Sequence, residues 1–88
     1  MADGQVVDVI KLFKDAALEV SNRKLEGLSG TTVISQLGMD SVAVMELVSY
    51  FEEKLNVRMP DEDLARINTI GDLSGLIQKL MPHARVQA

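Results

Sequence analysis

The sequence predicts an all-α fold: a small four-helix bundle of three main antiparallel helices and one short helix, with a long first loop. The chain has 88 residues, the length of one small domain, and 47% of them are hydrophobic. In four segments the apolar residues recur three or four positions apart, and the strict alternation that is typical of strands is absent. The core is therefore expected to be built from helices and aliphatic side chains.

The first helix is expected from about Gln5 to Val20. Its apolar stripe consists of Val6, Val9, Ile10, Phe13, Ala17 and Val20. Either Asp3 or Asp8 suits its N-terminal end, where negative charge is favoured. The pair Ser21-Asn22 ends it.

A long connection follows, from about Asn22 to Met39, and glycines make its backbone turn often. It also carries five apolar anchors: Leu25, Leu28, Val33, Ile34 and Leu37. A loop this long is uncommon in a compact domain unless it is functional or tied down. We expect an ordered loop packed across the helices, with a short helical turn near Val33–Gln36.

The second helix is expected from about Ser41 to Leu55, with Asp40 or Ser41 at its start and Asn56 closing it. Its wide apolar face is formed by Val44, Met45, Leu47, Val48, Phe51 and Leu55. A face of this width packs on more than one neighbour or lines a cleft.

Two further helices follow Pro60, a residue that favours the first turn of a helix. The short one runs from Asp61 to about Arg66, and the last runs to Leu80. Thr69 with an acid three residues later predicts a capping box, and Ile70, Leu73, Ile77 and Leu80 form the last apolar stripe. Pro82 ends this helix, so residues 1–82 form the domain and residues 83–88 are expected to be a disordered tail.

The residues needed for catalysis or metal binding are nearly absent. There is no cysteine, and the only histidine, His83, lies in the expected tail. The acids at 61–63 lack the glycine and the glutamate of a calcium loop, and no glycine-rich phosphate loop occurs. We therefore expect no catalytic residues, no metal site and no enzymatic activity.

The sequence also allows an expectation about the location and the oligomeric state of the protein. The start, Met1-Ala2-Asp3-Gly4, has no apolar signal-peptide core, and no apolar run approaches the ~20 residues that span a membrane. A cytoplasmic monomer that does not bind membranes is the expectation.

Excess negative charge lies in one central segment. Residues 40–63 hold seven acids and two bases, a balance of −5, whereas the rest of the chain is at +1. Such a surface repels nucleic acid and attracts basic protein partners. The simpler alternative is a solvated helix face without a partner.

Ser41 stands at the start of the second helix, where a serine or aspartate usually acts as an N-cap. A helix N-terminus also has free N–H groups and a positive dipole end, so that it tolerates an attached phosphate. Position alone is compatible with modification of Ser41 and does not require it.

The segment Leu37-Gly38-Met39-Asp40-Ser41, continued by residues 42–48, resembles the acyl carrier protein family. The likeness extends through residues 51–55, 60–64 and 69–73. It implies that Ser41 carries a covalent 4'-phosphopantetheine arm, attached by a phosphopantetheinyl transferase. The arm would hold acyl intermediates as thioesters for polyketide or fatty-acid type synthesis. Met1 and the complete helical span favour a free-standing type II carrier.

The chain departs from the family pattern at two positions after the serine. Val42 replaces the usual leucine and Ala43 replaces a residue that is often acidic in fatty-acid carriers. The second change favours a polyketide or other specialised pathway. Two rivals stay open: an aminoacyl, peptidyl or D-alanyl carrier, and a helical interaction domain without a prosthetic group.

The resemblance also suggests roles for two groups of residues. Six acids would dock on basic patches of an acyltransferase, a ketosynthase or other biosynthetic enzymes: Asp40, Glu46, Glu52, Glu53, Asp61 and Glu62. Six apolar residues would border a cleft for the acyl chain: Val44, Leu47, Phe51, Leu64, Ile67 and Ile70. For most of the second group, an ordinary core position is the alternative.

Overall fold

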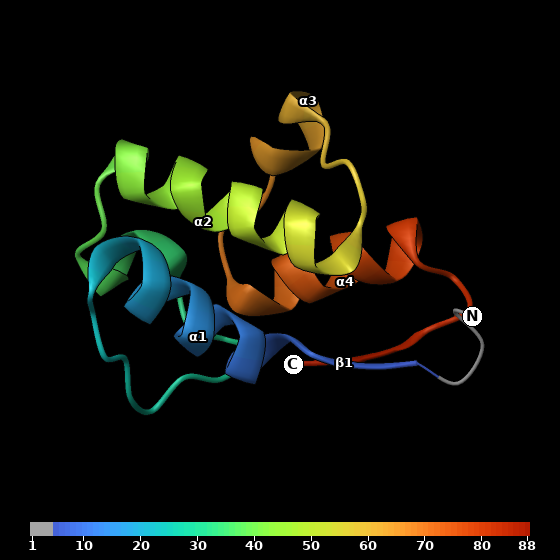
Figure 1. Ribbon diagram of the computed structural model, residues 1–88, viewed down its shortest axis with the longest axis horizontal. Coiled ribbons are helices and arrows are strands. Elements are labelled where there is room, and N and C mark those ends of the chain that lie inside the picture. The colour runs from blue at the N-terminus through green and yellow to red at the C-terminus, as the bar shows by residue number, and fades with distance from the viewer. Residues whose placement is uncertain (1–4) are drawn as a thin grey trace.

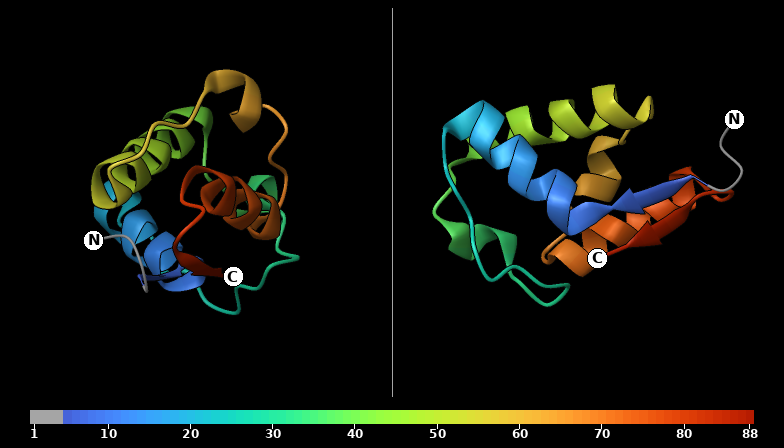
Figure 2. Two further views of the ribbon diagram at one scale, coloured as in Figure 1. Left: turned by 90° about the vertical axis from the view of Figure 1, so that its right-hand side faces the viewer. Right: turned by 60° about the horizontal axis from the view of Figure 1, so that its bottom comes forward.

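The computed structural model describes residues 5–88 and confirms a small helical bundle (Figure 1). Its elements in chain order are β1 (Val6–Asp8), α1 (Val9–Ser21), the 3₁₀ helix η1 (Ile34–Leu37), α2 (Ser41–Leu55), α3 (Asp61–Leu64), α4 (Ile70–Leu80) and β2 (Arg85–Gln87). In Figure 1, α2 crosses the upper part of the molecule, with α3 above it and α1 and α4 below it. The two further views in Figure 2 show α3 as a short link beside α2 on the way to α4.

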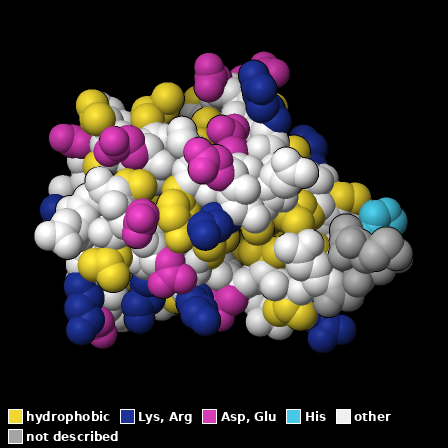
Figure 3. All heavy atoms as spheres, in the orientation of Figure 1, with side chains coloured by type: hydrophobic (Ala, Val, Ile, Leu, Met, Phe, Trp, Pro, Cys, Tyr) yellow, Lys and Arg dark blue, Asp and Glu magenta, His cyan; other side chains and the backbone are white. Residues whose placement is uncertain are grey.

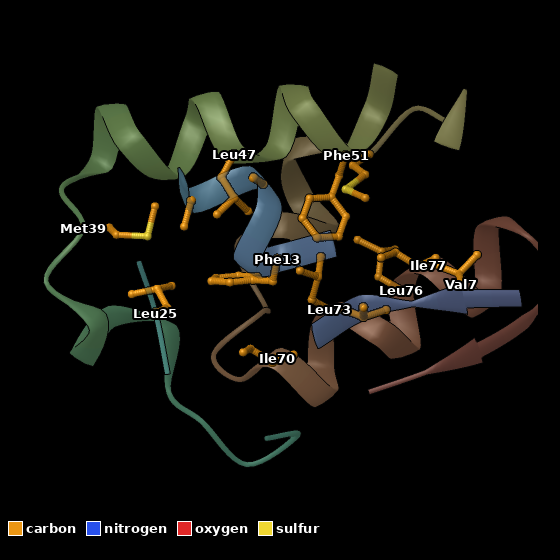
Figure 4. Close-up of a cluster of buried hydrophobic side chains, with 14 of the residues drawn as sticks. Val7, Phe13, Leu25, Met39, Leu47, Phe51, Ile70, Leu73, Leu76 and Ile77 are labelled. Carbon is orange, nitrogen blue, oxygen red and sulfur yellow. The ribbon is translucent and has the colours of Figure 1, made fainter. Parts of the chain in front are cut away.

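The core lies where α1, α2 and α4 meet, because each turns an apolar stripe inward (Figure 4). Its largest fully buried side chains are Phe13, Phe51, Ile70, Ile77 and Val9. The rings of Phe13 and Phe51 meet edge to face, with centroids 6.3 Å apart and planes at 64°. This is a favoured aromatic geometry, so the pair joins α1 to α2 at the centre of the bundle.

Local sequence signals set the helix boundaries. Thr69 is the N-cap of α4, as predicted. Asp8 caps α1 and Asp40 caps α2, each being one of the two residues that the sequence left open, and the alternative Asp3 lies outside the described residues. Asn22 and Asn56 end α1 and α2 in the left-handed conformation, with φ of 53° and 54°. Asparagine tolerates this conformation better than most residues, which explains why both helices stop there.

The long loop between α1 and α2 is ordered, as expected, because its backbone is bonded to the start of α4. Val33 and Thr69 form an isolated antiparallel bridge, and the Ile34 N–H donates to the Asn68 carbonyl at 2.9 Å. The Gly71 N–H donates to the Gly30 carbonyl at 2.7 Å, and a Cβ at Gly71 would lie 2.8 Å from that oxygen. The predicted helical turn is present as η1.

The chain ends differ from the prediction. Residues 83–88 were expected to be disordered, but β2 pairs with β1 in parallel, with Val7 opposite Val86. The first helix accordingly begins at Val9 rather than near Gln5. The cause is non-local: Val7 and Ala84 are buried against the bundle, and the side chain of Gln78 forms hydrogen bonds with residues that follow α4.

Gln78 is the residue that holds this C-terminal segment. Its amide nitrogen donates to the carbonyls of Met81 and Ala84 at 3.1 and 2.9 Å, and its amide oxygen accepts from the Val86 N–H at 3.3 Å. The Arg85 N–H donates to the Gln5 carbonyl at 2.7 Å. The short helix α3 also ends earlier than predicted, at Leu64, and the chain continues in tighter turns through Arg66.

The capping box at α4 predicts a contribution to stability that depends on pH. The N–H groups of Asn68 and Thr69 both donate to Asp72 at 3.0 Å, and these bonds, that from Asn68 first, lower the pKa of Asp72 below its ordinary 3.8. A lowered pKa gives stability that is present above the unfolded pKa and is lost as pH falls through the folded pKa.

We therefore expect the free energy of unfolding of wild type to fall below about pH 4, and to fall less steeply in Asp72→Asn. Urea titrations between about pH 5 and pH 2 measure it. Asp15→Asn is the matched control, because this exposed carboxylate on α1 makes no hydrogen bond within the described part of the chain. Equal slopes in both variants would contradict the assignment.

Candidate functional site

Ser41 is the first residue of α2, and its side chain is exposed. The helix cap is Asp40, whose Oδ1 accepts the Ala43 N–H at 2.8 Å. Within residues 5–88, no group forms a hydrogen bond with the Ser41 hydroxyl. Asp40 thus does the capping for which the sequence offered two candidates, and the serine hydroxyl is left free at the positive end of the helix.

The three residues before Ser41 are each held by a different contact. Gly38 has a left-handed backbone with φ of 77°, and its carbonyl accepts a hydrogen bond from Arg23 Nη1 at 3.1 Å. Met39 is buried beside Leu25 at one end of the core (Figure 4). Asp40 caps the helix. Arg23 is a contributor to this site that the sequence patterns did not reveal.

A pocket of about 620 Å³ opens beside Ser41 between α2, α3 and the start of α4. Its size is in the range of small-molecule sites. Apolar side chains dominate its lining: Phe13, Ile34, Met39, Val44, Met45, Leu47, Val48, Leu64, Ile67 and Leu73. Ser41 itself stands on its rim among the lining residues.

The predicted cleft residues divide into two groups in the structure. Val44, Leu47, Leu64 and Ile67 line the pocket. Phe51 and Ile70 do not line it; both are fully buried in the core instead. Helical spacing shows which residues share a face, but it does not show where along that face the packing opens, and this explains the difference.

A second hollow of about 560 Å³ lies at the other end of α1. It is lined by charged residues, including Asp8, Lys11, Lys14 and Asp15, and by the chain end at Gln87 and Ala88. Such a lining does not suit an apolar ligand. The apolar pocket beside Ser41 is therefore the candidate binding site.

Acidic side chains spread over the part of the surface formed by α2 and α3 (Figure 3). Of the six predicted docking acids, five are exposed: Asp40, Glu46, Glu53, Asp61 and Glu62. Glu52 is only partly exposed, and its Oε2 accepts the Met59 N–H at 2.7 Å, so it stabilises the turn after α2. Between the acids, Val42 and Met45 are exposed apolar residues, at 67% and 59%.

Features of metal or membrane proteins are not found in the described residues. No three histidine or acidic side chains within residues 5–88 come together as a metal site. No helix in that same stretch is long and apolar enough to cross a membrane. A free serine hydroxyl at a helix start lies beside an apolar pocket and an acidic surface in this small helical domain, which is the arrangement that the resemblance to carrier domains implies.

Comparisons with known proteins identify the family. The family model described as a phosphopantetheine attachment site matches residues 11–77. Over 77 residues the chain is 43% identical to an acyl carrier protein from Rhodococcus erythropolis, covering 88% of this chain and 75% of that protein. It is also 43% identical over 47 residues to the meromycolate extension acyl carrier protein of Mycolicibacterium smegmatis, of which it spans 48%. The chain belongs to the acyl carrier proteins of the phosphopantetheine-binding family.

Solved structures agree with this placement. An acyl carrier protein from Thermotoga maritima matches with a TM-score of 0.77 and 30% identity, over 84% of this chain and 87% of that one. The acetyl actinorhodin acyl carrier protein from Streptomyces coelicolor matches with a TM-score of 0.63 and 26% identity, over 84% and 86%. The resemblance inferred from the residues around Ser41 is thereby confirmed at the level of family and fold.

Proposed function

We propose that Ser41 carries the 4'-phosphopantetheine arm and that the chain shuttles acyl groups between enzymes of polyketide or fatty-acid type synthesis. Family membership supports the arm itself. The observation that carries the choice of residue is the exposed Ser41 hydroxyl: Asp40 caps the helix, and the hydroxyl makes no hydrogen bond to any residue of the described stretch 5–88.

The residues around Ser41 fit a phosphodiester. An exposed hollow of about 310 Å³ runs along α2 from Ser41 past Val42 and Met45, which leaves room for an attached group. The positive end of α2 favours the negative charge that the phosphodiester would bring. A transferase and its metal supply the chemistry, and the chain supplies an accessible nucleophile.

In the attachment step, the phosphopantetheine group is transferred from coenzyme A to the Ser41 hydroxyl. The Ser41 Oγ forms a bond to the phosphorus that bears the pantetheine, and the bond from that phosphorus to the bridging oxygen of the coenzyme A pyrophosphate breaks. The bridging oxygen leaves with its electron pair on 3',5'-adenosine diphosphate. The serine proton passes to a base of the transferase. The thiol of the attached arm then supplies the group on which an acyl chain is held as a thioester.

Intact-mass measurement tests the proposal. The apo chain is incubated with coenzyme A and a broad-specificity phosphopantetheinyl transferase, and one added phosphopantetheine is expected. No gain, under conditions that modify a control carrier, would refute it and favour a helical interaction domain. No gain is expected with coenzyme A alone, because the chain is proposed to have no catalytic activity of its own.

The exposed acids are proposed to steer basic partner enzymes, beginning with the transferase. Exposed ion pairs are worth under ~1 kcal/mol each and are weakened by salt, which suits a shuttle that must leave each enzyme. They raise association rates more than affinity. Glu46 is the strongest candidate because it is exposed one turn from Ser41 and lines the same hollow.

Glu46→Lys is expected to lower kcat/KM of the transferase for this chain by about three- to tenfold at low salt, and by little near 1 M salt. Glu26→Lys is the matched control: it makes the same charge change in the loop after α1, outside the acidic surface of α2 and α3. Equal losses in both variants would show that net charge, rather than the surface of α2, governs docking.

The apolar pocket is proposed to shelter the acyl chain. Each buried methylene contributes at most ~0.8 kcal/mol, so a short chain would be held loosely and released readily. Amide shifts at Val44, Leu64 and Ile67 are expected to grow with the length of the loaded acyl group, and thioester hydrolysis to slow.

Val44→Phe is expected to fill the pocket and remove this dependence on chain length, because Val44 lines it. Val42→Phe is the matched control, since Val42 lies outside the pocket on the exposed side of α2. NMR titration of loaded chains and hydrolysis rates provide the measurement. If the amide shifts and the hydrolysis rate still depend on acyl-chain length in Val44→Phe, the pocket does not shelter the acyl chain.

The cargo, partners and setting are proposals too. Two of the similar proteins are an actinorhodin acyl carrier protein and a meromycolate extension acyl carrier protein. Ala43, at a position that is often acidic in fatty-acid carriers, favours a specialised pathway. We propose a cytoplasmic monomer served by an acyltransferase and a ketosynthase. Offering the holo chain a panel of acyl and aminoacyl donors decides the cargo, since loading by aminoacyl donors alone would favour the peptidyl or D-alanyl alternative.

A further inference from the structure

A hydrogen bond crosses from the end of α1 to the turn before Ser41. Arg23 follows the left-handed cap residue Asn22, and its own N–H donates to the Ala17 carbonyl at 3.2 Å, so its backbone is fixed to the last turn of α1. From there Nη1 reaches the Gly38 carbonyl at 3.1 Å, across 15 residues of sequence. Arg23 and Gly38 also line a common hollow of about 340 Å³ with Asp40 and Val42.

The guanidinium of Arg23 also covers the Cα of Gly38. A Cβ built on Gly38 would lie 3.0 Å from Nη2 and 3.5 Å from both Cζ and Nη1. All three atoms approach the same point, so the planar group packs against the glycine while it donates to its carbonyl. Contact and hydrogen bond together restrain the one left-handed residue in the Gly38-Met39-Asp40 turn.

Of the three restraints on this turn, Arg23 is the one that acts on Gly38 itself. Burial of Met39 and the cap made by Asp40 hold their own residues. With Arg23 removed, Gly38 could rotate, because glycine populates both signs of φ readily. Ser41 begins α2 three residues later, so the direction of the helix start depends on this turn.

We infer that Arg23 is a positioning residue for arm attachment: by fixing Gly38 it holds the Ser41 hydroxyl where a transferase needs it. This inference rests on the proposed function, in which Ser41 is the nucleophile. Displacement at phosphorus requires the reacting atoms about 3–3.5 Å apart and aligned, so looser placement lowers turnover. The docking contacts of α2 are untouched, so binding should change little.

Because Arg23 is positively charged, a positioning role and a docking role predict different kinetic effects when that charge is removed. Partners are proposed to be basic, and loss of a positive charge at Arg23 would therefore lower KM if Arg23 acted on encounter. A positioning role instead predicts a lower kcat with KM unchanged. Gly38 offers an independent probe, since Gly38→Ala places a methyl against Nη2, whereas Gly27→Ala carries a similar φ of 68° with nothing within 4 Å.

The experiment measures transferase kinetics on five variants. Arg23→Met should lower kcat by about three- to tenfold, the worth of one net hydrogen bond, with KM within about twofold. Arg23→Lys should recover most of the rate, because its ammonium can reach the same carbonyl. Lys24→Met removes the same charge at the next residue and should match wild type, and Gly38→Ala should lose more rate than Gly27→Ala.

A second readout does not depend on the arm. In the apo chain, Arg23→Met should shift the Gly38 carbonyl carbon resonance and lower the amide order parameters of Asp40 and Ser41, with α1 and α4 unchanged. Unaltered order at Ser41 would overturn the inference, as would equal rates for Arg23→Met and wild type. If wild type accepts no arm at all, the proposed attachment fails, and the order parameters alone still decide the role of Arg23.

Discussion

Replacing Ser41 with alanine is expected to abolish arm attachment completely while leaving the fold intact. The hydroxyl is the proposed nucleophile, and alanine offers the transferase no oxygen. Stability should change by less than about 0.5 kcal/mol, because Ser41 is exposed, makes no hydrogen bond within residues 5–88, and leaves the cap at Asp40 in place. Intact mass after incubation with coenzyme A and a transferase, with thermal unfolding in parallel, provides the measurement.

Ser49→Ala is the matched control for this variant. Ser49 is exposed two turns further along α2 and lines the same hollow of about 310 Å³. It should gain one phosphopantetheine at the wild-type rate. An arm found on Ser41→Ala, or lost from Ser49→Ala, would move the attachment site away from the start of α2.

The helices were predictable because their signals are local. The caps at Asp8, Asp40 and Thr69 were among the candidates that the sequence offered, and Asn22 and Asn56 end α1 and α2 as expected. Each of these signals acts within a few residues. The pairing of β1 with β2 was missed because it joins the two ends of the chain. Its apolar residues are too few to form a periodic pattern, and its hydrogen bonds to Gln78 depend on the tertiary fold.

The candidate site was predictable in part for the same reason. Ser41 and its acidic neighbours lie on one helix, so their pattern is visible in the sequence. The pocket instead combines residues of α1, the loop, α2, α3 and α4. Phe13 and Ile34 lie outside α2, so the apolar pattern of α2 could not predict that they line the pocket. The bond from Arg23 to Gly38 is equally non-local, although a glycine after a helical turn is a signal for a left-handed residue.

Phe51 is a residue for which the sequence left both a cleft role and an ordinary core position open, and the two can be tested. The sequence placed it at the acyl-chain cleft, whereas the structure buries it fully and sets its ring edge-on to Phe13. Phe51→Ala is therefore expected to destabilise the fold by about 3–5 kcal/mol, because truncating a buried aromatic loses its burial and leaves a cavity. For a domain of this size that lowers the unfolding midpoint by more than about 12 °C.

This loss is large relative to the whole stability of a small domain, roughly 5–15 kcal/mol, so Phe51→Ala should be partly unfolded at 37 °C. Urea and thermal unfolding of Phe51→Ala and Phe51→Leu measure the effect, and the leucine variant should lose less because it keeps most of the apolar volume. Met45→Ala is the control on the same helix: its side chain is 59% exposed and its removal should cost little. A Phe51→Ala chain with near wild-type stability but no response to acyl-chain length would instead return Phe51 to the pocket wall.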